Sequence, residues 1–486
     1  MRHSKGARIG LVVLAGLLFA AVAYADIGDQ TIPVDWFGRV RSFLGLFVMI
    51  GIAVALSSDR KNISWRLVGT GVGLQLALGV ITRTGPGEKF FGAFDKAVTA
   101  ILGYTAKGSQ FLFGNLAVQN TMPVGTSVVP MPAAGATPGW LADAKMAPVI
   151  PVEDFTWVNI GAYFAFGVLP TIIFFSSLMA VLYHLGVMQK LVNVLALFMQ
   201  KTMRTSGAET LSATGNIFVG QTEAPLLVRP FIKEMTLSEL MAVMTGGFAT
   251  VAGGVMVAYV GILKNVFPGI AGHLLCASIM SAPAALVIAK IMVPEPDPTK
   301  SATFGTLKVD LPSQDANIID AAARGAGEGL QLALNVGAML LAFVALIAMV
   351  NGIIGGVAEL LGATEPVTLE LILGYVLRPL AWCMGIAWED AQIIGSLLGI
   401  KTILNEFVAY LQLAQQAPQL ASQRSFVIAT YAMCGFANFG SIAIQIGGIS
   451  PLAPERRSDL ARLGLRAMIG GTLAAFMTAC VIGVLI

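Results

Sequence analysis

Charged residues are scarce in this chain. Of its 486 residues, 12% are Asp, Glu, Lys or Arg, and 30 basic against 27 acidic residues give a formal net charge of +3. Soluble globular chains carry about 25% charged residues, so the composition excludes a soluble multidomain enzyme. A balance so near neutral excludes a nucleic-acid-binding surface, and a hydrophobic fraction of 56% excludes intrinsic disorder. The composition therefore indicates an all-α polytopic membrane protein.

Residues with metal-binding or redox chemistry are also few. The chain has three scattered histidines and four cysteines, which lie in apolar stretches without a C-x-x-C partner. This pattern predicts buried cysteines that form neither a disulfide framework nor a metal site. A membrane enzyme would need a nucleophile–base or metal constellation, so we expect no enzymatic activity and no cofactor.

What the chain has instead is a series of long apolar stretches. A membrane-spanning helix needs about 20 such residues. We expect about eight spans, at residues 37–57, 63–82, 156–185, 237–263, 270–293, 328–361, 424–448 and 464–486. The stretch 328–361 is longer than a bilayer requires, which predicts a strongly tilted helix.

The ends and loops of the chain predict its orientation. Residues 1–25 have the form of a secretory signal peptide, with an uncleaved first membrane helix as the alternative. Basic residues gather in the loops 57–66 and 449–466, which predicts that both loops are cytoplasmic. Counting spans then makes the Pro/Gly-rich loop 120–155 and both ends of the mature chain periplasmic, in a bacterial inner membrane. The polar linker 294–327 is expected in the cytoplasm.

Two segments, 205–235 and 381–413, are too polar for ordinary spans and carry Glu223 and Glu406. We predict that they are re-entrant hairpins, because non-helical backbone at membrane depth is tolerated only where it lines a protein cavity. Each is followed by a Gly-Phe-Ala string, and the two hairpins are expected to enter from opposite sides. An inverted pair of interrupted helices indicates a secondary transporter with its site near the bilayer midplane.

The carboxylates of Glu223 and Glu406 are the most informative groups. A charge at bilayer depth costs at least about 2.5 kcal/mol, so it usually faces a cavity and has a function. The two groups could bind a cation, carry a proton or accept hydrogen bonds from a polyhydroxylated solute; a structural pair with Lys401 or Arg229 is the alternative. The amides and hydroxyls nearby, with no basic residue among them, suit a neutral hydrogen-bonding solute; they are Asn216, Gln221, Thr222, Asn438 and Ser441.

Four strings at these positions resemble the concentrative nucleoside transporters. They are GNIFVGQTEAPLLVRPF (215–231), GGFATVAGGV (246–255), NEFVAY (405–410) and CGFANFGSIAIQIGG (434–448). The resemblance runs from about residue 37 to the end of the chain. It implies nucleoside import across the inner membrane by symport with sodium, through an elevator-like movement of a transport domain against a scaffold, in a homotrimer. A proton-coupled nucleoside symporter, with Glu223 or Glu406 carrying the proton, is the alternative.

The resemblance also implies domains and site residues. The scaffold would comprise 156–186 and 328–361, and the transport halves 187–293 and 362–486, following N-terminal helices at 26–119. The substrate residues would be Gln221, Thr222 and Glu223 at the nucleobase, Val255 beside it, Glu406, Asn438 and Ser441 at the ribose, and Phe436 on the gate side. The sodium site would take side-chain oxygens from Asn216 and Thr250 and backbone carbonyls from Val219 and Val251.

Overall fold

The fold was analysed in a computed structural model of the chain. It describes residues 35–82, 84–117, 120–124, 156–160, 164–297, 301, 303, 315–363 and 366–486. The predicted signal segment 1–25 and most of the Pro/Gly-rich loop 120–155 lie outside the described residues.

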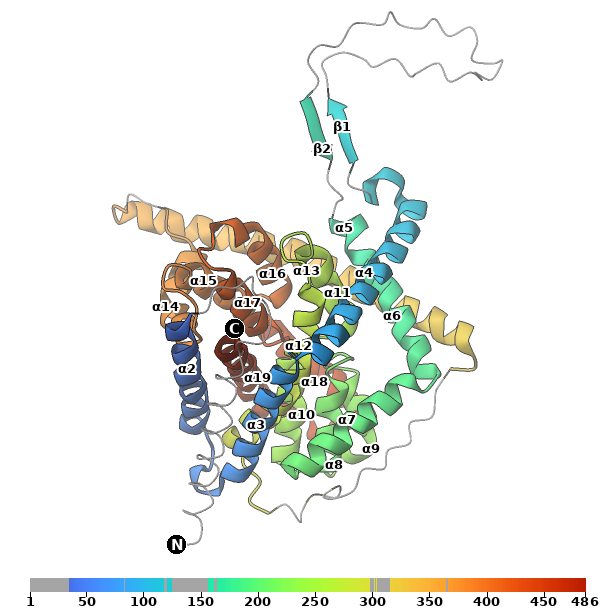
Figure 1. Ribbon diagram of the computed structural model, residues 1–486, viewed down its shortest axis with the longest axis vertical. Helices are drawn as coiled ribbons and strands as arrows, with labels where there is room; N and C mark the ends of the chain where they lie inside the picture. Colours follow the sequence, from blue (N-terminus) through green and yellow to red (C-terminus); the bar gives the residue numbers. More distant parts are fainter. Residues whose placement is uncertain are drawn as a thin grey trace, which may run out of the picture.

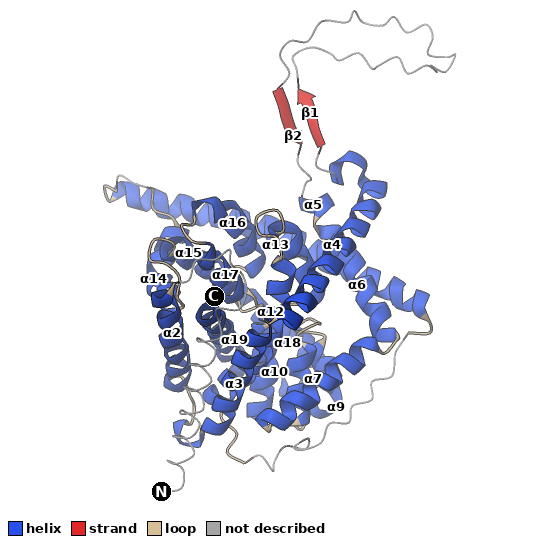
Figure 2. Cartoon of the chain, viewed as in Figure 1, coloured by secondary structure: helices blue, strands red, loops and turns tan. Residues whose placement is uncertain are grey.

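Helices form nearly all of the described chain (Figure 2), which confirms the predicted all-α fold. The first half contains α2 (Trp36–Ala55), α3 (Trp65–Thr82), α4 (Gly85–Phe113), α5 (Phe164–Gly167), α6 (Leu169–His184), α7 (Val187–Met203), α8 (Gly207–Gly215), α9 (Arg229–Ile232), α10 (Leu237–Ala249), α11 (Gly253–Leu263) and α12 (Ile270–Met292). The second half contains α13 (Ile318–Leu360), α14 (Leu369–Cys383), α15 (Ala391–Ile403), α16 (Glu406–Gln416), α17 (Gln423–Met433), α18 (Phe439–Ile449) and α19 (Arg457–Leu485).

One antiparallel ladder stands apart from the helices. Strands β1 (Asn120–Val124) and β2 (Thr156–Ile160) pair with Asn120 opposite Ile160. The ladder projects from the end of α4, away from the helical body (Figure 1). Its second strand corrects the predicted span 156–185, because the first five residues of that range are extended.

Seven helical stretches in the described chain are long and apolar enough to cross a membrane. They correspond to seven of the eight predicted spans. The eighth, 424–448, is divided into α17 and α18 by the non-helical residues 434–438. The structure thus has the expected number of apolar passes, one of them interrupted too strongly to count as a single helix.

Two predicted boundaries were wrong, and one helix was not predicted. Helix α13 begins at Ile318, ten residues before the predicted boundary at 328 between the linker and the scaffold helix. The second hairpin consists of α15 and α16, because residues 381–383 complete α14. Helix α4, with 29 residues, was not predicted as an element of its own; its lysines and aspartate interrupt the apolar pattern that a span would need.

The helices differ sharply in how far they are enclosed by protein. In the most apolar window of α12, 94% of the residues are buried, and the value is 89% for both α10–α11 and α19. The corresponding share is 22% for α6 and 11% for α13. The protein therefore has an enclosed helical core, and α6 and α13 expose most of their apolar surface, as helices facing lipid do.

Helices α6 and α13 pack closely through glycines. A Cβ added to Gly325 would lie 2.6 Å from Ala180 Cβ, and one added to Gly329 would lie 2.8 Å from Ile173 Cα. Glycines four residues apart lie on one helix face and allow two membrane helices to approach closely. Gly325, which precedes the predicted start of the long helix at 328, is thus part of its packing surface.

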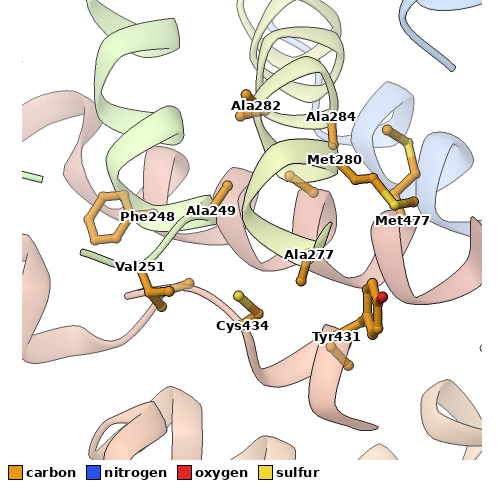
Figure 3. Packing of buried hydrophobic residues seen from close by; sticks show 14 of the residues in the cluster. Phe248, Ala249, Val251, Ala277, Met280, Ala282, Ala284, Tyr431, Cys434 and Met477 are labelled. Carbon is orange, nitrogen blue, oxygen red and sulfur yellow. The ribbon is translucent and has the colours of Figure 1, made fainter. Parts of the chain in front are cut away.

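The enclosed core contains the same unit twice. In the first unit, α8, a short 3-10 helix (Ala224–Val228) and α9 form a hairpin that precedes the broken helix α10–α11. In the second, α15 and α16 form the hairpin that precedes the broken helix α17–α18. The two breaks lie against each other, as the neighbouring Val251 and Cys434 show (Figure 3), and the Phe436 amide donates to the Thr250 carbonyl oxygen at 3.3 Å.

The close approach of the two breaks explains why residue 435 is a glycine. Gly435 has φ +143°, and a Cβ there would lie 2.7 Å from the Phe248 carbonyl oxygen. Only glycine adopts such a conformation without strain. The glycine of the Gly-Phe-Ala string in the second unit is therefore required by the contact between the two breaks.

The base of the first hairpin is held by a buried ion pair. Lys290 Nζ lies 2.6 Å from Glu209 Oε2, and the two side chains are 8% and 2% exposed. Glu209 also completes the capping box of α8 by accepting from the Ser206 amide at 2.8 Å. The pair therefore joins the start of the hairpin to the end of α12.

Candidate functional site

The hairpins and the broken helices meet in a hydrogen-bonded network. Gln221, near the tip of the first hairpin, donates from Nε2 to Ser441 Oγ in the first turn of α18 at 3.2 Å. Gln445, one turn further along α18, donates from Nε2 to Gln221 Oε1 at 3.1 Å and to the Met244 carbonyl oxygen at 3.1 Å. The first hairpin is thus joined to the second broken helix, 220 residues away in the chain.

Glu406, the first residue of α16, lies at the centre of the network and is 4% exposed. Its Oε1 accepts from the Tyr259 hydroxyl at 2.6 Å, and its Oε2 accepts from Asn438 Nδ2 at 3.2 Å. Each carboxylate oxygen therefore has a donor, which is how a buried carboxylate is stabilised. The same oxygens can accept from the hydroxyls of a solute that displaces either donor.

Two asparagines orient the helix starts that form the site. Asn405 caps α16 by accepting from the Val408 amide at 3.0 Å, and Asn438 caps α18 by accepting from the Ser441 amide at 2.9 Å. Asparagine is among the best N-cap residues. These caps explain the Asn-Glu and Asn-Phe pairs in the sequence, and they place Glu406 and Ser441 in the first turns of their helices.

Three further predicted residues border this network. Val255 lies one helical turn before Tyr259 on α11 and is 4% exposed. The Thr222 side chain packs against Gly448, where an added Cβ would lie 2.5 Å from Thr222 Cγ2. Phe436 lies in the second break and is partly buried.

Glu223 lies apart from Glu406, on the wall of an open cavity. Its Oε2 accepts from the Gly220 amide at 3.1 Å, and its side chain is exposed to the cavity. The cavity has a volume of about 490 Å³ and lies between the tip of the first hairpin and helices α6, α7 and α13. The two predicted carboxylates thus differ: one is enclosed in the network, and the other faces accessible space.

The α13 wall of this cavity is polar. Arg324, Glu328, Gln331 and Asn335 line it at spacings of four, three and four residues, which places them on one helix face. Asp315, just before α13, is paired with Arg324 at 2.6 Å, and this hydrogen bond holds the pKa of Asp315 below its usual value. The cavity therefore has a polar, hydrogen-bonding wall on an otherwise apolar helix.

Two of the four residues predicted for sodium, Asn216 and Thr250, lie beside the same residue, Gly246. Asn216 ends α8 and lies beside Gly246, whose carbonyl oxygen accepts from Thr250 Oγ1 at 2.9 Å. Asn216 Oδ1 is buried and has no hydrogen-bond donor among the described residues. A buried oxygen without a donor is costly, and a cation bound there would satisfy it. No cluster of three His, Cys, Asp or Glu side chains suited to a metal occurs in the described chain.

Sequence reasoning missed two members of the network. Gln445 lies seven residues after Asn438 and four after Ser441, so the helical period could have placed it on their face. Tyr259 had no such signal, because its partner Glu406 is 147 residues away. The polar face of α13 was also missed, although its spacing is visible in the sequence.

Paired re-entrant hairpins and broken helices, with polar groups meeting at the breaks, define the chain as a secondary transporter. The models of the Na+ dependent nucleoside transporter N-terminus and C-terminus match residues 44–116 and 273–483, and a nucleoside recognition model named Gate matches 165–266. The chain belongs to this family, the concentrative nucleoside transporters, which confirms the resemblance predicted from its motifs.

Relatives of known sequence support this membership. The uncharacterized transporter YutK of Bacillus subtilis is 42% identical over 446 residues, which cover 91% of this chain and 98% of that protein. Sodium/nucleoside cotransporter 1 of Rattus norvegicus is 39% identical over 459 residues. The chain spans only 63% of the length of that relative.

Solved structures share the fold as well. CNTnw in an inward-facing substrate-bound state is 43% identical with a TM-score of 0.76, and the alignment covers 92% of this chain and 97% of CNTnw. A doubly substituted CNTnw in an outward-facing state has a TM-score of 0.79, over 93% and 98% of the two chains.

Proposed function

We propose that the protein imports nucleosides across the bacterial inner membrane by cotransport with sodium. The observation that carries this proposal is the network in which Gln221, Ser441, Asn438 and Glu406 meet from both halves of the chain. It combines amides, a hydroxyl and one carboxylate, which suits a neutral solute with several hydroxyls. Membership of a sodium-dependent nucleoside transporter family supports the same solute class.

The solute would take over hydrogen bonds that these residues now make with one another. A nucleobase would compete with Ser441 for Gln221 and contact Thr222, Glu223 and Val255. Ribose hydroxyls would donate to Glu406 and accept from Asn438, with Phe436 at the gate. An analogue that lacks a ribose hydroxyl would leave the buried polar group facing that position without a hydrogen-bond partner. Because an unpaired buried polar group is costly, the analogue should bind much more weakly than the nucleoside.

Sodium would bind where Asn216 and Thr250 adjoin Gly246, with the carbonyls of Val219 and Val251 completing the site. Val219 is two residues from Gln221, so a cation that orders this tip also orders the nucleobase site. Binding of ion and nucleoside would then be reciprocally coupled. The ion is a cotransported substrate here and not a resident cofactor.

Translocation would move the enclosed core against α6 and α13. Structures of the relative CNTnw are described as inward-facing, intermediate and outward-facing, and this series of states supports such a movement in that protein. The polar face of α13 would line the release route through the 490 Å³ cavity. We also propose a homotrimer with α13 in the scaffold, and periplasmic ends of the mature chain.

Uptake into liposomes tests the proposal. Labelled uridine should accumulate under an inward sodium gradient and not without sodium. An inward proton gradient without sodium forms the second arm, because accumulation there would favour the proton-coupled alternative with Glu223 or Glu406 as carrier. Equilibration without accumulation in both arms would refute secondary active transport by this protein.

A further inference from the structure

Tyr259 is a buried tyrosine that contributes a hydroxyl to the network but no contact to the proposed solute site. It lies on α11 of the first unit, has 0% exposure, and donates to Glu406 Oε1 at 2.6 Å. Glu406 starts α16 of the second hairpin, 147 residues away in the chain. A hydroxyl of the first unit therefore holds the carboxylate of the second unit, on which the proposed ribose contact depends.

Aromatic rings fix the position of this hydroxyl. The centroid of the Tyr259 ring lies 5.4 Å from that of Phe407 and 4.6 Å from that of Tyr410. Both rings belong to α16, the helix that Glu406 starts. Tyr410 is held in turn, since its hydroxyl donates to the Thr430 carbonyl oxygen of α17 at 2.7 Å. Tyr259 thus packs along the helix that carries its acceptor, and rotating away from it would break these ring contacts.

The two donors of Glu406 differ in how a solute can reach them. Asn438 donates to Oε2 at 3.2 Å, a longer bond than the 2.6 Å bond from Tyr259 to Oε1. Phe439, directly after Asn438, is 52% exposed, whereas Ala258, directly before Tyr259, is 0% exposed. A solute can therefore approach the longer bond, while the shorter bond is closed off by the packing of α11.

The chemistry of a hydroxyl fits the longer bond. A hydroxyl can donate and accept at the same time. A ribose hydroxyl inserted between Glu406 and Asn438 would donate to Oε2 and accept from Nδ2, so both groups would keep a partner. Insertion at Oε1 would have to push the Tyr259 hydroxyl from its acceptor, which the packing of its ring against α16 opposes. The bond from Tyr259 therefore directs the solute to Oε2.

Helix α11 also connects the two parts of the proposed solute site. Val255, expected beside the nucleobase, lies four residues before Tyr259 on this helix. Residues four apart lie on one helix face, separated by about 6 Å along the axis. One helix of the first unit thus carries both the wall beside the base and the group that holds the ribose acceptor, so it sets the position of one relative to the other.

We propose that Tyr259 is a positioning residue that determines sugar specificity: it holds Glu406 so that Oε2 is the acceptor presented to a ribose hydroxyl. The proposal rests on the proposed function and adds a residue outside the predicted site. Tyr259 acts through Glu406 and does not contact the solute.

The first test compares Tyr259→Phe with the native protein in liposomes, using uridine, 2′-deoxyuridine and 3′-deoxyuridine. The KM for uridine should rise about tenfold or more, because the carboxylate loses the bond that orients it. The KM for the analogue that lacks the contacted hydroxyl should rise less, so discrimination shrinks. A native KM, or an equal rise for all three solutes, would overturn the inference and leave import intact. Absence of uridine uptake by the native protein would instead refute the proposed function.

Tyr410→Phe is the matched control. It removes the hydroxyl of the neighbouring ring, which is also 0% exposed but donates to a backbone carbonyl oxygen and not to Glu406. It should lower the Tm and leave the discrimination between uridine and its deoxy analogues unchanged. An equal loss of discrimination in Tyr410→Phe would show that loss of any buried hydroxyl in this cluster suffices, and would overturn the specific role of Tyr259.

A double substitution tests whether Tyr259 acts through Glu406. In a Glu406→Gln background, Tyr259→Phe should raise the KM for uridine by a smaller factor than in the native protein, because the charge that it positions is gone. Equal factors in the two backgrounds would mean that Tyr259 acts independently of Glu406, and would overturn the inference.

A structure of the native protein with uridine bound decides even if Tyr259→Phe does not fold. The Tyr259 hydroxyl should remain within about 3 Å of Glu406 Oε1, with a ribose hydroxyl at Oε2. A ribose hydroxyl at Oε1 with Tyr259 displaced would overturn the inference.

Discussion

The sharpest prediction concerns Glu406→Gln, which keeps the shape of the side chain and removes its charge. In the structure both carboxylate oxygens accept, from Tyr259 at 2.6 Å and from Asn438 at 3.2 Å. Glutamine keeps one acceptor and puts an NH2 group where the other oxygen was, so one acceptor for a solute hydroxyl is lost. A hydrogen bond to a charged group contributes about 1.5–3 kcal/mol. At 1.4 kcal/mol per factor of ten, the affinity for uridine should fall about 10- to 100-fold.

The assay pairs the substitution with deoxy analogues. Uptake of uridine, 2′-deoxyuridine and 3′-deoxyuridine is measured in liposomes for both proteins. If Glu406 accepts from a ribose hydroxyl, the native protein discriminates against one analogue and the variant discriminates less, because the lost contact is the same. An unchanged KM for uridine, or undiminished discrimination with a raised KM, would remove Glu406 from the ribose site.

Three other substitutions test the sodium site and the packing. Thr250→Val removes a hydroxyl beside Asn216, and a hydrogen-bonding ligand contributes about 1–1.5 kcal/mol, so the sodium concentration for half-maximal uptake should rise about tenfold. Thr472→Val, the control, removes a hydroxyl from α19 and should leave that sodium concentration unchanged. Gly329→Leu forces α6 and α13 apart and should destabilise the protein by about 1–3 kcal/mol, which lowers the Tm. Gly327→Leu adds a side chain where nothing lies within 4 Å and should leave the Tm unchanged. Equal melting curves for the two variants would refute the packing argument. Lys290→Met leaves the buried Glu209 carboxylate without its ion-pair partner and should lower the free energy of unfolding by about 3–5 kcal/mol. A native Tm would mean that the ion pair contributes nothing to stability.

The sequence predicted the hairpins and breaks because these features violate the pattern around them. Carboxylates and amides inside apolar runs are costly, so Glu223 and Glu406 could be recognised without any structure. The structure adds the asparagine caps, since Asn405 and Asn438 stand directly before the helices that they start. A feature could be predicted from the sequence wherever the contact that determines it joins residues only a few positions apart in the chain.

The remaining features depend on distant contacts. The start of α13 was predicted ten residues too late because Arg324 looks like a loop residue, although it faces a cavity and leaves the other faces of the helix apolar. The boundary of the second hairpin was wrong because α14 and α15 form one moderately apolar run in the sequence. Tyr259 was missed because only the tertiary fold brings it to Glu406.

Gln445 shows why the two halves should act as one body. Its amide reaches Gln221 in the first hairpin and the Met244 carbonyl oxygen in α10, while its own helix carries Asn438 and Ser441. Gly247 makes this possible, since a Cβ there would lie 2.7 Å from Gln445 Nε2. A rearrangement at the tip of the first hairpin, where we propose that sodium binds, would therefore be transmitted to the α18 residues that would bind the ribose, without any movement of the scaffold. Coupling between ion and solute then requires only that the enclosed core move as a unit, which its extensive burial favours.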